Sequence, residues 1–368
     1  MSKARQLADL GNQVDDGAIT GTNMVVNGGM TISQRGTSFV SPASGDYLLD
    51  RVVYQHSGTT ARITSTQESD GVVGVSPKSF KAQITTAANA SPSANCFTQF
   101  VYYFEGNDVD HLGLGTSSCK PITLSFYIKC STTGTLPIGV SNGGTRSFPA
   151  TYNVTEANVW QRHIIKIPAV TDGSWGSGIN RGLELRLGLE YGSDYTGGTA
   201  NEWNSIVGFA NFTTTYTNPV ASTLNATWQI TGVCLNVGDS AIDFPHESYG
   251  DTLAKCQRYY QVGAFNGNAG TDLGDTNPTV SWMPVTAMRA SATMSMRNDS
   301  AISNRYIDSA GNSVSWLYGG ISHRADNTSY TGSYTNSIDT GMFVLDIGSA
   351  SVGAASWIRF FWQADAEL

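Results

Sequence analysis

Short runs in which apolar and polar residues alternate strictly are the feature that most constrains the fold of this chain. Residues 122–130 carry an apolar side chain at every second position from Ile122 to Ile128, and residues 183–189 repeat the pattern with leucines around Glu184 and Arg186. Period-two alternation puts one face of a strand on a core and the other in water, which is typical of antiparallel sheets. About eight such runs between residues 23 and 247, separated by turn clusters, predict a two-sheet, jelly-roll-like β-sandwich.

A short helical signal interrupts the β pattern near residue 248. Ser248 and Asp251 have the spacing of a capping box, in which a serine and an acidic residue satisfy backbone N–H groups at a helix start. The residues at i, i+3, i+4 and i+7 of the next turns form one face, namely Leu253, Cys256, Gln257 and Tyr260. A lone helix between two β-rich blocks is most simply a joint, so residues 248–261 are predicted to be a helical joint.

The block from residue 262 to 368 is predicted to be a second, smaller β domain. Its strand candidates are Thr279–Pro284, Val314–Tyr318, Met342–Ile347 and Ser356–Trp362. Residues 267–277 and 326–336 have the composition of long polar loops. The chain is therefore predicted to be all-β, with two sheet units and one short helical joint.

A group of residues around the joint carries a family resemblance. They are Ile230–Gly238, Phe244, His246, Tyr249, Gly250, Leu253, Ala254 and Cys256–Tyr260, with weaker pieces at Asn27–Gly28, Gln34–Gly36, Leu49–Arg51, Gly188–Leu189, Met288–Arg289 and Ala364–Leu368. In this order the pieces resemble bacteriophage virion appendage proteins, which are tail-fibre-like chains with a β-sandwich followed by such a joint. The chain departs from the family at Cys234 and Asn236, where Gln and Glu are usual, and at Asp243 and Pro245. These departures leave open which appendage the chain is.

The resemblance implies a non-enzymatic structural protein of the virion, a tail fibre or receptor-binding appendage that forms a homotrimer. Residues 1–22 would anchor the chain to other phage tail or capsid proteins, although a frayed terminus fits the same residues. Residues 23–247 would form the sandwich, and residues 262–368 a distal domain that contacts polysaccharide on the host cell surface. The protein would be assembled in the host cytoplasm and act in the virion. A capsid-attached head fibre or decoration protein is the structural alternative.

Composition excludes several classes of function. Charged residues make up 14% of the chain, against roughly 25% in ordinary globular proteins. A net charge of −8 without a stripe of Lys and Arg argues against nucleic acid as a partner. Membrane insertion is not expected, because no run of 18 apolar residues occurs. The five scattered cysteines lack a C-x-x-C pair, which favours free thiols in a reducing compartment.

The sequence carries no Walker loop or dinucleotide-binding motif, so no catalytic residue, metal or cofactor is predicted. His246–Glu247 lacks the second histidine of a zinc motif. The close acidic pairs Asp108–Asp110 and Asp272–Asp275 could in principle serve a glycosidase or hold Ca²⁺, but a solvated loop is the preferred interpretation, and neither pair has the spacing of a known calcium loop. A capsule-degrading tailspike is the enzymatic alternative, although such enzymes usually carry a repetitive β-helix that this sequence lacks.

Aromatic residues inside polar loops are the candidate ligand-binding positions. A flat ring can cover the apolar face of a sugar, while neighbouring Asn, Asp and Thr groups bond its hydroxyls. The candidates for glycan contact are Trp175, Tyr195, Tyr330 and Tyr334. The competing interpretation, which is preferred for Trp203, is that such rings only pin loops to the sandwich.

Overall fold

The computed structural model describes residues 23–89, 92–206 and 211–268. In the rest of the chain it describes residues 279–282, 286–290, 292–296, 305–307, 313–315, 343–346 and 357–368. The chain divides into two compact units, of which the first ends at Thr252 and includes Leu368, and the second runs from Leu253 to Glu367. The proposed anchor, residues 1–22, lies outside the described residues.

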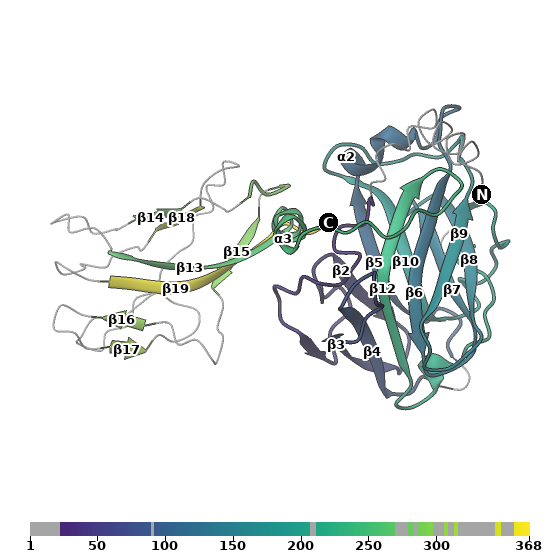
Figure 1. Ribbon diagram of the computed structural model, residues 1–368, viewed down its shortest axis with the longest axis horizontal. Coiled ribbons are helices and arrows are strands. Elements are labelled where there is room, and N and C mark those ends of the chain that lie inside the picture. Colours follow the sequence, from purple (N-terminus) through teal and green to yellow (C-terminus); the bar gives the residue numbers. More distant parts are fainter. Residues whose placement is uncertain are drawn as a thin grey trace. The chain divides into compact units, whose positions relative to one another are not determined.

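The first unit is a sandwich of two six-stranded sheets, and Figure 1 shows its strands running side by side. Sheet A has the order β1 (Ser38–Val40), β3 (Arg62–Glu68), β4 (Ser79–Thr86), β12 (Thr227–Val237), β6 (Ile122–Cys130), β9 (Gln161–Ile167). Sheet B has the order β11 (Asn204–Ser205), β8 (Arg146–Val154), β7 (Gly134–Ser141), β10 (Arg181–Tyr191), β5 (Phe97–Glu105), β2 (Val52–Ser57). Neighbouring strands are antiparallel throughout both sheets, so the predicted β-sandwich is confirmed. Short helical turns α2 (Gly106–Val109), η2 (Asp110–Leu112) and η3 (Val220–Ser222) connect strands.

The core lies between the two sheets and follows the predicted alternation. The alternating leucines of β10 and the apolar residues of β6 are buried in one cluster, namely Leu183, Leu185, Leu187, Leu189, Ile122, Leu124, Phe126 and Ile128. Trp228 is fully buried at the centre, where its ring stacks on Phe100 at 5.4 Å and its Nε1 donates to the Tyr152 hydroxyl at 2.8 Å. Each such side chain contributes about 1.5–3 kcal/mol by leaving water.

The apolar run at residues 25–32 predicts the first strand of the sandwich, and this prediction is wrong, because most of these residues form a turn. Asn27 and Met30 have φ angles of 62° and 57°, in the left-handed region. The Asn27 side chain closes the turn, since its amide donates to the Ile32 and Asp50 carbonyls and its oxygen accepts the Ile32 N–H. An asparagine tolerates this conformation and makes such local hydrogen bonds.

The N-terminal segment lies along the second half of β12. After a bulge between Thr231 and Cys234, β12 no longer pairs with β4, and the N-terminal segment takes that place through bonds between Met24 N and Leu235 O and between Val233 N and Gly28 O. A Cβ atom on Gly28 would lie 2.0 Å from the Val233 oxygen, so only glycine allows this approach.

The helix α3 (Tyr249–Gln257) begins where the sequence predicted it. The Ser248 hydroxyl accepts the Asp251 N–H at 3.1 Å and donates to the Asp251 carboxylate at 2.6 Å. The predicted helical face extends too far, because α3 ends at Gln257 and its last predicted member, Tyr260, begins strand β13. None of the helices in the described part of the chain is long and apolar enough to span a membrane.

The second unit is built around β13 (Tyr260–Asn268) and β19 (Trp357–Asp365), which pair antiparallel along their whole length. Its other strands are β14 (Thr279–Trp282), β15 (Thr293–Met296), β16 (Arg305–Ile307), β17 (Ser313–Ser315) and β18 (Phe343–Asp346), drawn in Figure 1. All four predicted strand segments overlap one of these elements. Arg289 ties the unit together, since its N–H donates to the Arg258 carbonyl and its Nε to the Ala366 carbonyl.

Candidate functional site

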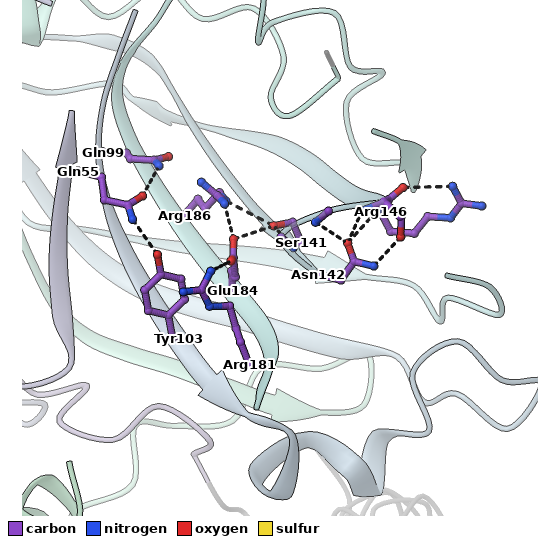
Figure 2. Close-up of polar contacts among 12 residues, drawn as sticks. Gln55, Gln99, Tyr103, Ser141, Asn142, Arg146, Arg181, Glu184 and Arg186 are labelled. Atoms are coloured by element: carbon purple, nitrogen blue, oxygen red, sulfur yellow. Dashed lines mark hydrogen bonds and ion pairs between the residues drawn. The ribbon is translucent and has the colours of Figure 1, made fainter. Parts of the chain in front are cut away.

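Polar side chains line sheet B in three neighbouring groups of contacts, most of them on the outer face, which is turned away from the core. Figure 2 shows one group at Gln55, Gln99 and Tyr103, one around Glu184, and one at Asn142 and Arg146. The side chains of the first two groups on β2, β5, β7 and the middle of β10 point outward because their neighbours along each strand fill the core, whereas Asn142 and Arg146 lie at the ends of β7 and β8. This set of side chains is referred to below as the sheet B network.

Glu184 on β10 is the centre of the sheet B network and has no exposed surface. Its carboxylate pairs with Arg181 at 2.8 Å and with Arg186, and it accepts the Ser141 hydroxyl at 3.2 Å. Gly143 lies directly over it, since a Cβ there would be 2.7 Å from Oε1 of Glu184. The expectation that Glu184 faces water is therefore wrong, because arginines and a glycine turn cover the carboxylate.

Both arginines also lie on aromatic rings. The Arg181 Cζ is 3.7 Å from the ring centre of Tyr103, and the Arg186 Cζ is 3.8 Å from that of Phe212. Such cation–π contacts contribute about 0.5–2 kcal/mol each and fix the plane of the guanidinium. The two guanidinium groups are therefore held by aromatic rings as well as by Glu184.

Amides and hydroxyls form one end of the network. Gln55 donates to the Tyr103 hydroxyl at 2.8 Å, and Gln99 donates to the Gln55 side-chain oxygen at 2.9 Å. The Tyr191 hydroxyl completes the row by donating to Gln99. Burial raises the pKa of Tyr103, so its hydroxyl stays protonated at neutral pH.

The other end of the network is a charged loop pair next to a tryptophan. Arg146 donates through Nε and Nη2 to both oxygens of Asp172, and the hydrogen bond lowers the pKa of Asp172. Asn142 bridges the chain here, because its amide donates to Thr145 Oγ1 and to the Ser174 carbonyl, both at 2.8 Å. Trp175 follows directly and donates its indole N–H to the Asp172 carbonyl at 3.0 Å.

Buried members of the network hold accessible ones in place. Gln99 and Ser141 are buried like Glu184, whereas Arg181 keeps 40% of its side chain exposed, and Gln55 is half-buried. Accessible polar groups whose orientation is already fixed lose little conformational entropy when they bind a ligand. The face can therefore bind a polar, hydroxyl-rich molecule.

The structure places Trp175 and Trp203 together at one end of sheet B. Their rings meet edge to face at 5.7 Å, and the Trp203 indole donates to the Pro168 carbonyl at 2.7 Å. Both rings are half-buried and pack against the sandwich core, so the packing interpretation of Trp203 is confirmed. Trp175 combines that packing with a position beside Asp172, at the end of the network.

Tyr195 is 7% exposed and packs in a small cluster with Tyr191, Ile206 and Phe212. In this conformation its ring cannot lie flat on a sugar. It packs instead in the cluster that contains Phe212, the ring in contact with Arg186. The glycan contacts predicted for Tyr330 and Tyr334 lie outside the described residues.

Of the two acidic pairs in the sequence, only one lies within the described residues. Asp108 and Asp110 lie in α2 and η2, and residues 271–278, which include Asp272 and Asp275, are outside the described part. Among the described residues, no group of three or more His, Cys, Asp or Glu side chains is placed to hold a metal ion.

Comparison with known proteins gives similarities only among solved structures, since no family model and no curated protein matches. The enzymatically active domain of tailspike protein 4 from bacteriophage CBA120 aligns with 59% of this chain and 21% of its own, at 13% identity and a TM-score of 0.33. A CBM4 carbohydrate-binding module aligns with 58% of this chain and 98% of its own, at 15% identity and a TM-score of 0.29. A putative sugar-binding protein from Bacteroides thetaiotaomicron aligns with 59% and 100%, at 11% identity and a TM-score of 0.28. The chain thus spans about a fifth of the tailspike structure and nearly all of the two smaller ones.

Proposed function

We propose that this chain is a structural virion protein, a phage tail fibre or receptor-binding appendage, which binds host-surface glycan through the outer face of sheet B. The observation that carries the glycan part is the sheet B network, in which buried groups fix accessible amide and guanidinium groups beside Trp175. A hydroxyl-rich ligand needs such directed hydrogen bonds together with aromatic contact area.

The virion part of the proposal is supported by the places where the family-like pieces meet. Asn27 and Gln34 both bind Asp50, through its carbonyl and its carboxylate respectively. In the second unit, Arg289 donates its main-chain N–H to the Arg258 carbonyl and its Nε to the carbonyl of Ala366, which follows β19. Residues that resemble the family therefore hold the fold together, which fits a shared architecture with variable surfaces.

A role without catalysis is supported by the state of the carboxylates in the network. Glycoside hydrolysis needs two carboxyl groups about 5–10 Å apart on either side of the sugar bond. Glu184 is held by Arg181 and Arg186, and Asp172 is held by Arg146, so each carboxylate already accepts charge-assisted hydrogen bonds. We therefore expect binding without release of reducing ends, which incubation of the protein with host polysaccharide measures directly.

Glycan-array binding by the full chain tests the glycan proposal. We expect Gln55→Ala and Trp175→Ala to weaken binding severalfold, because each removes a contact group at one end of the network. Tyr127→Ala, on the outer face of sheet A, is the matched control and should bind like the parent. Undiminished binding by both network variants would show that the glycan binds elsewhere.

Electron microscopy of intact particles with a labelled antibody tests the virion proposal. Label on the tail supports a tail fibre, label on the capsid supports a head fibre or decoration protein, and absence of label from particles contradicts both. The mass of the purified protein in solution tests the proposed homotrimer.

A further inference from the structure

The charge of the sheet B network differs in sign from that of the whole chain. Its charged side chains are Arg146, Arg181 and Arg186 against Asp172 and Glu184, so three positive and two negative charges give +1, whereas the chain carries −8. Of the other charged groups at this face, Arg51 before β2 and Glu105 at the end of β5 are buried and have opposite signs. The chain end at Leu368 packs beside Tyr103 and accepts the Tyr47 hydroxyl at 2.8 Å. An anionic ligand is thus favoured on this face and disfavoured by the chain as a whole.

Arg181 has the geometry to bind an anion. Its Cζ lies 3.7 Å over the ring centre of Tyr103, and a guanidinium directs its five N–H groups outward in its own plane. One N–H of Arg181 meets Glu184 at 2.8 Å, and 40% of the side chain is exposed. The fork of a guanidinium matches a carboxylate, which accepts two parallel hydrogen bonds.

A second arginine makes a neutral sugar a poor match for this face. Arg186 retains only 14% of its side-chain surface, and it shares the single carboxylate of Glu184 with Arg181. Covering two guanidinium groups with a neutral ligand would remove water from a charge that Glu184 alone does not balance. A carboxylate on the ligand would supply the missing partner.

We infer that the ligand of the sheet B face is an acidic polysaccharide, whose uronate-type carboxylate binds Arg181 with Arg186 behind it. This inference rests on the proposed function and specifies the class of glycan. The amide of Gln55 lies on the same face and can bond a hydroxyl group of an adjoining sugar, while buried Gln99 holds it in place.

Titration of the full chain with paired ligands tests the inference. The probes are short oligogalacturonates, hyaluronan fragments and sialylated oligosaccharides, each compared with its carboxyl-reduced form, with neutral glucans and galactans as further ligands. We expect at least one acidic probe to bind, and reduction of its carboxylates to weaken binding at least about tenfold, which is about 1.4 kcal/mol. Affinity for it should also fall as salt rises from about 0.05 to 0.5 M.

Two arginine variants locate the contact. Arg181→Gln should weaken binding of the acidic probe at least about tenfold, and binding of the carboxyl-reduced probe hardly at all. Arg162→Gln is the matched control, because Arg162 on β9 also lies near a tyrosine ring and a carboxylate, but on sheet A. Thermal unfolding of both variants verifies that the fold is retained.

The outcomes separate this inference from the proposed function. Equal binding of acidic and carboxyl-reduced probes, binding of neutral glycans alone, or equal effects of Arg181→Gln and Arg162→Gln would overturn the inference and leave glycan binding in place. Binding to none of the acidic or neutral glycans would overturn both.

Discussion

Replacing Glu184 by alanine should destabilise the sandwich strongly, because it leaves two arginines facing each other without a carboxylate. Breaking a fully buried ion pair costs about 3–5 kcal/mol. Water reaches 40% of the Arg181 side chain and 14% of that of Arg186, so part of this cost is relieved and we expect about 2–3 kcal/mol. For a unit of this size, 1 kcal/mol shifts the unfolding temperature by about 2–4 °C, so Glu184→Ala should lower it by about 5–10 °C.

Calorimetry of the parent and three variants measures this effect. Glu184→Gln keeps the shape of the side chain and should lie between the parent and Glu184→Ala. Glu68→Ala is the control, because Glu68 pairs with Lys81 at 3.3 Å on the surface and exposed pairs contribute less than about 1 kcal/mol. If Glu184→Ala cost no more than Glu68→Ala, the network would not be a buried charged centre, and the reasoning from its geometry would fail.

Two further predictions concern the fold. Gly28→Ala should lower the free energy of unfolding by about 1–3 kcal/mol, because its Cβ would lie 2.0 Å from the Val233 oxygen. Gly144→Ala is the control and should be tolerated, because a Cβ there meets nothing within 4 Å. Urea unfolding compares the two variants, and equal midpoints would contradict the close approach at Gly28. His163 packs on Phe126 and its burial lowers its pKa below 6.5. The unfolded chain therefore binds a proton at His163 more readily than the folded protein does. The contribution of His163 to stability is complete above about pH 6.5 and declines as the pH falls toward the folded-state pKa. His163→Phe should flatten this part of the curve of unfolding temperature against pH, and an unchanged slope would refute the prediction.

Strands with strict alternation could be predicted from the sequence. The run Ile122–Cys130 coincides with β6, and the leucines of β10 are buried as expected. The pattern is reliable here because a half-buried strand has only one way to place its apolar side chains. The turn at residues 25–32 could not be predicted, because the apolar residues from Val25 to Ile32 favour a strand. The turn depends on hydrogen bonds from the Asn27 side chain to the Ile32 and Asp50 carbonyls.

The sheet B network could not be derived in the same way. Its contacts require β10 to lie between β5 and β7, and this order of strands cannot be predicted from any single run of residues. One local signal was available, because Glu184 and Arg186 share a face of a strand otherwise made of leucines, and opposite charges at that spacing can pair. Tyr103 and Gln55 carry no comparable signal, since their role depends on the register between β2, β5 and β10.

The path of the chain around β12 has a consequence for modular exchange. Asn23 binds the main chain at Val233 and Leu235, close to the end of β12 at Val237, so the polypeptide enters and leaves the sandwich at neighbouring points. A unit whose two ends adjoin can be inserted into a host sequence without changing the distance between the flanking segments. The whole sandwich can thus be transplanted or replaced as a cassette between the same two attachment points.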